Sequence, residues 1–355
     1  MKQALVLALI VAVLPLLRAS DDEVILENPE FRTIGIVSVS GDQFMVNAGG
    51  AETHFKLNRI KTLLFDTDQN DPDWQGGQQA FWDKKWSTCF DRMSAVVKTI
   101  DNGGDFRDMC VPIAYYYYAV AAGHVGKAKI SQAYFAKAFA SPLFKSPHPL
   151  YVEALKDAAL LSVDEHNIDG AKALLPQLST IDPEMCSYVK AEVAMAENDL
   201  ATASTEFGNL ASSKNPVMQA RGKMGATRVA LAKKSYDDAI TSAQAAISSA
   251  DGNQTILGDA YFYMGEALQA KAATGQTDDD RAQMLQDAAK SFMRVVALYD
   301  LSDQQIPAAQ AALACFDRLQ SFRNKIDSIK DIPFNRYAAK VRMWLASQGV
   351  SSSSN

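Results

Sequence analysis

Apolar and polar residues follow two different periods along the chain, and the change of period divides it. Between about residues 33 and 65, short apolar runs are separated by turn residues, Gly41-Asp42 and Gly49-Gly50. Runs of about five residues between glycine-containing turns are typical of antiparallel β-strands. Beyond about residue 78, apolar residues recur over segments of about 12–20 residues, as in helices. The pattern therefore predicts a mostly α protein: a small β module over 24–66, an acidic linker over 67–77 and helices over 78–348.

The first 20 residues have a different character. Lys2 precedes an unbroken apolar run over residues 4–17, and Arg18-Ala19-Ser20 follows it. The run is shorter than the about 20 residues that span a bilayer. Early positive charge, a short apolar run and small residues after it are typical of a secretory signal peptide. We therefore expect residues 1–20 to be removed on export to the periplasm or cell surface, with an uncleaved anchor as the alternative.

Turn and terminator residues recur along the helical region with a period near 34. Pro183 and Pro216 lie 33 residues apart, and Gly265 is followed by the pair Ala288 and Phe292. These features resemble the tetratricopeptide repeat (TPR) family, whose unit is a helix–turn–helix with small residues where the two helices touch. Residues 272–281 are then expected to form an inserted loop. Five units are predicted to begin near residues 112, 152, 184, 220 and 258, between capping helices over 78–100, 304–322 and 336–348.

The TPR resemblance implies a right-handed helical solenoid. The β segment is similar to the SH3-like modules that precede helical repeats in some exported bacterial proteins. In TPR arrays the first helix of each pair lines a concave groove, which implies a partner-binding surface here. Arg221 and Arg228 lie seven residues apart on one helix face, and with Lys156 they are expected to bind a carboxylate or an acidic peptide; an ordinary solvated face is the alternative. The implied groove residues are Tyr116, Lys156, Tyr188, Glu192, Arg221, Arg228, Phe262 and Glu266.

Composition narrows the classes of partner. The 355 residues include 35 Lys and Arg against 41 Asp and Glu, a net charge of −6. A negative chain is repelled by phosphate, which argues against nucleic acid or an anionic membrane as the main partner. The expected partner is a protein or peptide, and no transmembrane segment is expected after the signal. Residues 349–355 are serine-rich and are predicted to be disordered.

Motifs that carry chemistry are missing from the sequence. It contains no phosphate-binding glycine loop, no H-E-x-x-H and no G-x-S-x-G. The four histidines are far apart in sequence, so neither a metal site nor a catalytic triad is predicted, and no cofactor is expected. An acidic stretch at Asp66, Asp68 and Asn70 is similar to a calcium loop, but Asp71 and Gly77 stand where glycine and glutamate are needed. A solvated linker is the preferred interpretation.

The cysteines admit two interpretations. In an oxidising compartment a disulfide is possible, and Cys89 and Cys110 would lie on neighbouring helices. Counted from a turn near residues 103–104, however, they are offset by about 13 Å along the helix axes, beyond the reach of a disulfide. We therefore favour thiols at all four positions, which are Cys89, Cys110, Cys186 and Cys315.

The leading functional hypothesis is a non-catalytic interaction scaffold in the periplasm or cell envelope. Its groove would bind an extended or helical peptide from another protein. The first alternative is an accessory subunit of an envelope assembly or export machine. The second is an enzyme with an unrecognised site in the β module, for which His54, Lys56 and Asn58 are the candidates.

Overall fold

The structure is a computed structural model of the 355-residue chain, and helices form most of the part that it describes. The chain divides into two compact units, Met1–Ile181 and Asp182–Asn355, and each is treated by itself. The predicted signal and the Ser-rich tail lie outside the described residues. Those residues are 22–26, 31–40, 43–48, 51–56, 60–64, 71–108, 110–145, 148, 150–250, 252–299 and 302–350.

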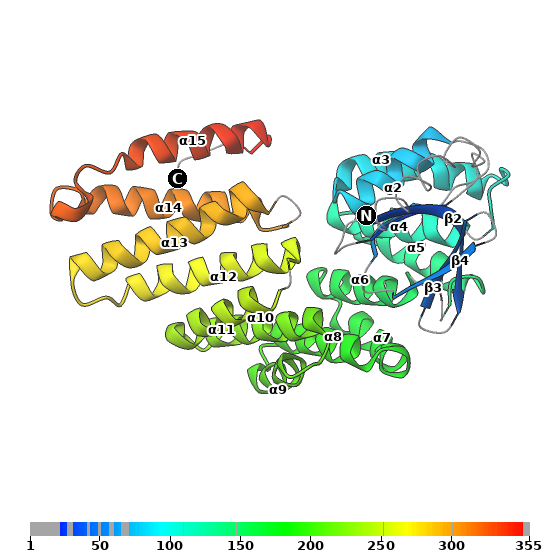
Figure 1. Cartoon of the computed structure of the whole chain (residues 1–355), viewed down its shortest axis with the longest axis horizontal. Helices are drawn as coiled ribbons and strands as arrows, with labels where there is room; N and C mark the ends of the chain where they lie inside the picture. The colour runs from blue at the N-terminus through cyan, green and yellow to red at the C-terminus, as the bar shows by residue number, and fades with distance from the viewer. Residues whose placement is uncertain are drawn as a thin grey trace, which may run out of the picture. The chain divides into compact units, whose positions relative to one another are not determined.

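The helices follow one another as hairpins, and within each unit consecutive helices pack together (Figure 1). The five predicted repeat units correspond to five such hairpins, whose first helices begin at residues 110, 151, 183, 216 and 254. The helices of the first unit are α2 (Pro72–Trp82), α3 (Trp86–Asp101), α4 (Cys110–His124), α5 (Ala128–Ala140), α6 (Tyr151–Asp164) and α7 (Ile168–Ile181). Those of the second are α8 (Pro183–Ala196), α9 (Leu200–Ala211), α10 (Pro216–Ala232), α11 (Tyr236–Ser249), α12 (Gln254–Ala272), α13 (Asp278–Leu298), α14 (Gln305–Phe322) and α15 (Phe334–Ser347), with a short 3₁₀ helix at Asp327–Ile329.

The turns inside the hairpins repeat one backbone geometry. In each of five hairpins a single turn residue has positive φ, and the next residue donates its N–H to a carbonyl five positions earlier, at 2.8–2.9 Å. This is the Schellman motif, which ends a helix and satisfies its last carbonyls. The recurrence is independent geometric evidence for a repeat, because it uses none of the family's side-chain pattern. The positive-φ residues are Lys84, Gly126, His166, Asn198 and Lys234.

Small residues allow the paired helices to touch closely. A Cβ at Gly265 would lie 2.6 Å from the Phe292 ring, and one at Gly225 would lie 2.1 Å from the Phe207 ring. Both rings are fully buried, so neither can move aside. Gly265 on α12 therefore lies directly against Phe292 on α13, and Ala288 is buried one turn before that ring.

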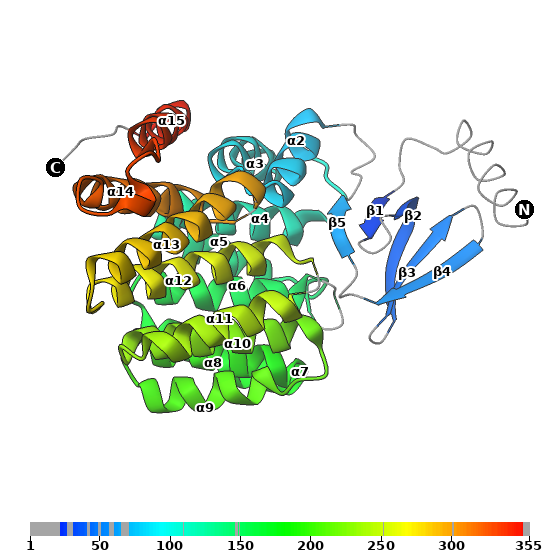
Figure 2. The same cartoon turned by 60° about the vertical axis from the view of Figure 1, so that its left-hand side comes forward.

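Five strands precede the helices. They form an antiparallel sheet in the order β4-β3-β2-β1-β5, in which the last strand returns to pair with the first. Figure 2 shows β3 and β4 as neighbours at one edge. The sequence predicts three or four strands in a meander; the pairing of β5 with β1 departs from that order. The strands are β1 (Asp22–Leu26), β2 (Phe31–Ser40), β3 (Gln43–Ala48), β4 (Ala51–Lys56) and β5 (Ile60–Leu64).

Three predicted boundaries are wrong. The single capping helix expected over 78–100 is a hairpin of α2 and α3 that turns at Lys84. The stretch 72–77, expected as linker, is the start of α2, because the Asp71 carboxylate accepts hydrogen bonds from the N–H groups of Asp73 (2.8 Å) and Trp74 (3.2 Å) and proline follows as the first helical residue. The stretch 272–281 is not an inserted loop. Only residues 273–277 connect α12 to α13; residue 272 and residues 278–281 belong to these helices, which are 19 and 21 residues long, and Thr277 caps α13 through the N–H of Asp280 at 3.1 Å.

Aromatic and sulfur groups fill the first unit's core. Of the four consecutive tyrosines on α4, Tyr116, Tyr117 and Tyr118 are buried, and only Tyr115 is partly exposed.

No disulfide joins any of the four cysteines, as the sequence favours, and burial raises the pKa of the Cys89 thiol to about 12. Within the described residues, no helix combines the length and apolar character that crossing a membrane requires.

Candidate binding surface on the first helices

Three first helices of the second unit, α8, α10 and α12, pack in sequence. Their side-chain contacts join residues about one repeat apart: Met185 with Arg221, Glu192 with Arg228, and Arg228 with Tyr263. Because these partners advance together along the chain, the three helices run parallel and in register. Capping side chains fix where these helices begin. At the three starts, the side chains of Asp182, Asn215 and Asn253 accept hydrogen bonds from backbone N–H groups.

At the centre of this surface, Arg228 binds Glu192. Its Nη1 lies 2.5 Å from Oε1 and 2.7 Å from Oε2 of the carboxylate. The Glu192 side chain is 10% exposed and that of Arg228 is 23% exposed. Burial by itself lowers the pKa of the guanidinium, but the Glu192 charge outweighs it and holds the pKa above its ordinary value. Arg228 also lies over the Tyr263 ring, 5.7 Å from its centroid. The chain itself thus supplies the carboxylate that the sequence expects from a partner.

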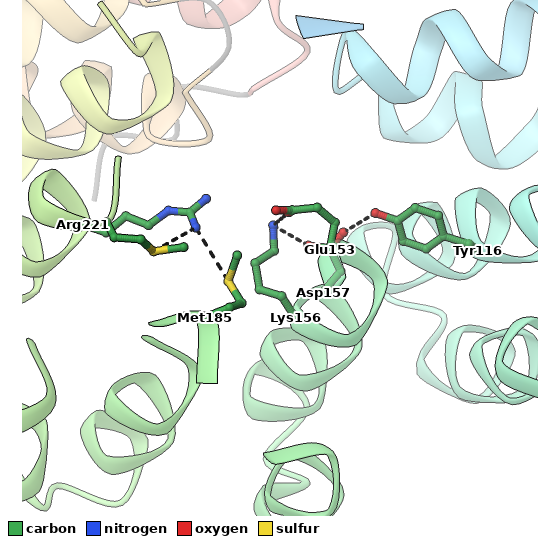
Figure 3. Close-up of polar contacts among 7 residues, drawn as sticks. Tyr116, Glu153, Lys156, Asp157, Met185 and Arg221 are labelled. Carbon is green, nitrogen blue, oxygen red and sulfur yellow. Dashed lines mark hydrogen bonds and ion pairs between the residues drawn. The ribbon is translucent and has the colours of Figure 1, made fainter. Parts of the chain in front are cut away.

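Arg221 lies two turns before Arg228 on α10, and its side chain is oriented by contacts other than an acidic residue. Its guanidinium carbon lies 5.1 Å from the centroid of the Tyr188 ring. Its Nη1 points to the sulfur atom of Met185 at 3.7 Å (Figure 3). The sulfur atom of Met218 lies 3.9 Å from the same nitrogen. Thioether sulfur is only a weak acceptor, and no carboxylate of the described residues forms an ion pair with Arg221. The side chain is therefore held in place with most of its donor capacity unused.

A second charged group on this surface is also poorly satisfied. Glu266 on α12 is partly buried, and burial raises the pKa of its carboxyl. No hydrogen bond or ion pair joins it to any residue that the structure describes. Glu266 lies three residues beyond Tyr263, which stands at the level of Arg228. The surface thus carries a cation and an anion, Arg221 and Glu266, on either side of the closed Arg228–Glu192 pair.

The predicted residues of the first unit behave differently. Tyr116 is buried, and its hydroxyl donates to Oδ2 of Asp157 at 2.7 Å. Lys156 forms ion pairs with Glu153 and, at 3.1 Å, with Asp157 (Figure 3). The ammonium is therefore neutralised by its own helix. Neither residue offers a charge to a partner, which corrects the prediction that Lys156 would join the two arginines in holding a carboxylate.

Phe262 is likewise a core residue, because it is 8% exposed and its ring centroid lies 5.8 Å from that of Phe292. Tyr188 is partly exposed and serves as the platform for Arg221. Burial raises the pKa of its hydroxyl, so it stays a neutral hydrogen-bonding group. Met185, Met218 and Tyr263 also contribute to this surface, although the sequence did not predict them. Their spacing from the arginines, at about one repeat or one helical turn, is the signal that would have identified them.

Among the described residues, no group of three or more His, Cys, Asp or Glu side chains is placed to hold a metal ion. The calcium-like stretch 66–70 lies outside the described residues, as do the side chains of His54, Lys56 and Asn58. No protein-family model matches the chain, and no curated protein sequence matches it.

Proposed function

We propose that this chain is a non-catalytic, TPR-like interaction scaffold, exported from the cytoplasm, that binds a peptide segment of another protein. Its helical array would be a right-handed solenoid, and the parallel first helices α8, α10 and α12 would form the binding surface. The hairpins that share one turn geometry, at intervals of 32–42 residues, support the repeat assignment. The signal-like residues 1–20 support export.

The observation that carries the proposal is Arg221. An arginine that has only weak acceptors yet is fixed on an aromatic ring is preorganised to receive an anion. Holding the side chain in place beforehand lowers the entropy that binding would otherwise cost. A carboxylate is the anion that peptides supply, either at an acidic side chain or at the C-terminus.

The surface also suggests the pattern of charge on the peptide. Arg228 aligns with Tyr263, so Arg221, seven residues earlier, aligns with about residue 256 of α12. Glu266 is then about 15 Å further along the helix axes, at 1.5 Å per residue. An extended peptide covers that distance in about five residues. We therefore expect an acidic residue for Arg221 and a basic residue for Glu266, about five positions apart.

The test is a peptide array with one substitution and its control. The array carries acid-x₄-base and base-x₄-acid peptides, which fit the two directions in which a peptide can run, together with peptides that carry two acids, two bases or no charge. The wild-type chain is expected to bind one of the two mixed-charge sets best. Arg221→Glu should lose that preference, whereas Lys233→Glu, an exposed charge reversal at the α10 C-cap, should keep it. Equal binding of all sets, or an unchanged preference in Arg221→Glu, would refute the assignment.

A further inference from the structure

A second candidate site lies at the C-terminal end of the second unit. A pocket of about 710 Å³ opens among α13, α14, the connection after α14, and α15. Its volume lies within the about 300–1,000 Å³ that is usual for small-molecule sites. It belongs to the second helix of one hairpin and to the next hairpin, so it is separate from the first-helix surface of α8, α10 and α12.

The pocket is built almost wholly from apolar side chains. Met293 and Val296 line it from α13, Phe316 and Leu319 from α14, and Val341 from α15. All these groups lie in a folded unit without needing a ligand to order them, so the cavity is preformed. An apolar cavity of this kind favours a ligand that buries methylene groups, each contributing about 0.8 kcal/mol of transfer free energy.

Aromatic rings contribute to the lining where α15 begins. Ile332, just before α15, and Phe334, its first residue, both line the pocket, and the Phe334 ring stacks against Phe316 with 6.4 Å between centroids. Tyr337 adds a further ring, 5.9 Å from Phe316. These rings give an acyl chain a broad apolar surface to pack against. The volume of about 710 Å³ lies in the range of small-molecule sites, so the pocket size favours a small ligand over a protein segment.

The charges around the opening have one sign on α15. That helix carries Arg336, Lys340 and Arg342 and no acidic residue, in a chain whose net charge is −6. Lys340 lines the pocket, is exposed, and has no ion-pair partner among the described residues. Lys290 lines it from α13 with its ammonium exposed, 2.9 Å from Asp287. The opening thus offers an unpaired cation beside an apolar interior.

We propose that this pocket binds a single-chain amphiphile with an anionic head, a long-chain carboxylate. The acyl chain lies against α13, α14 and the Phe334 ring, and the carboxylate pairs with Lys340. The indole of Trp344 also lines the pocket. It is the one tryptophan of the second unit, since the other three stand at positions 74, 82 and 86, and so it provides a local reporter.

The experiment titrates the full chain with cis-parinaric acid, a fluorescent long-chain carboxylate, and follows energy transfer from tryptophan. Saturable binding is expected, with palmitate displacing the probe and hexadecanol displacing it more weakly because it lacks the charge. Trp344→Phe should reduce the transfer while the probe's own fluorescence still reports binding. Transfer that is unchanged in Trp344→Phe would place the probe elsewhere and overturn the proposal.

Two substitutions test the chain and head sites separately. Ala297→Phe adds a ring at an exposed lining position of α13 and should weaken binding about tenfold by displacing about two methylene groups. Its control is Ala339→Phe, an exposed α15 position outside the lining. Lys340→Glu should weaken palmitate several-fold and hexadecanol little, whereas Lys233→Glu should change neither. Circular dichroism melts establish that all four variants are folded. Affinities that are unchanged in both Ala297→Phe and Lys340→Glu would refute the site.

Discussion

Replacing Arg228 tests whether this arginine stabilises the fold by pairing with Glu192 or is available to bind a partner. The carboxylate of Glu192, to which it binds, is 10% exposed. Arg228→Met keeps much of the apolar stem but leaves this carboxylate without its cation. Breaking a buried ion pair in this way costs about 3–5 kcal/mol, because the remaining charge stays desolvated. The contact with the Tyr263 ring adds about 0.5–1 kcal/mol.

A double variant separates the attraction between Arg228 and Glu192 from the cost of leaving Glu192 buried without a cation. Replacing both partners, as in Arg228→Met with Glu192→Leu, removes the uncompensated charge, and such exchanges are often neutral or stabilising. We therefore expect the double variant to be more stable than Arg228→Met alone by at least about 2 kcal/mol. Arg336→Met, at an exposed position of α15, is the control for loss of an arginine and should change stability by less than about 0.5 kcal/mol.

The assay is hydrogen exchange of the amides in α8 and α10 together with urea denaturation of the full chain. Exchange of these helices reports the stability of the second unit even when the first unit unfolds at a different urea concentration. A loss of less than about 1 kcal/mol in Arg228→Met, or additive effects in the double variant, would mean that Glu192 and Arg228 are not coupled. Arg228 would then be as available to an anionic partner as Arg221, and Arg221 would no longer be the preferred anion-binding residue.

Three further predictions concern the fold. Burial lowers the pKa of His148 from 6.5 to about 4. The stability that the neutral ring allows is therefore present above pH 6.5 and is lost as the pH falls toward 4, by at most about 3 kcal/mol and less where solvent screens the ring. Urea titrations of His148→Phe should show a smaller loss of stability over this pH range than those of the wild-type chain. Lys234→Gly should stabilise by about 0.5–1 kcal/mol, since φ is +60° at this residue; a lower urea midpoint would contradict the Schellman assignment. Gly265→Ala should cost about 1–3 kcal/mol, because its Cβ would lie 2.6 Å from the buried Phe292 ring; Gly208→Ala, which meets nothing within 4 Å, is the control and should not lower the thermal midpoint.

The sequence predicts the positions of the helices well because their boundary signals are local. Asp182-Pro183 and Asn215-Pro216 each combine a capping side chain with a proline at the first helical position, and α8 and α10 begin there. The same signal at Asp71-Pro72 was overlooked in favour of an acidic linker. Thr277, which caps α13, stands within the residues assigned to a loop, where the acidic run Asp278 to Asp280 suits a first helical turn.

The site residues were harder to predict, because their surroundings depend on the register between helices. Position in the repeat places Lys156 and Arg221 on equivalent helices, but it does not reveal that Glu153 and Asp157 neutralise Lys156. Position in the repeat also does not distinguish the two arginines. Arg228 forms an ion pair with Glu192 of the preceding repeat, whereas Arg221 contacts methionine sulfur. Family positions likewise could not show that Tyr116 and Phe262 face the core.

Arg221 is the residue that we propose receives an anionic group of a peptide partner. The most direct measurement is calorimetric titration of one mixed-charge peptide selected on the array, in its parent form and with the acid replaced by its amide. We expect the amide to bind the wild-type chain at least about tenfold more weakly than the acid, and Arg221→Met to bind both peptides equally weakly. Equal affinity of the two peptides for the wild-type chain would contradict this proposal, as would a full acid preference that persists in Arg221→Met.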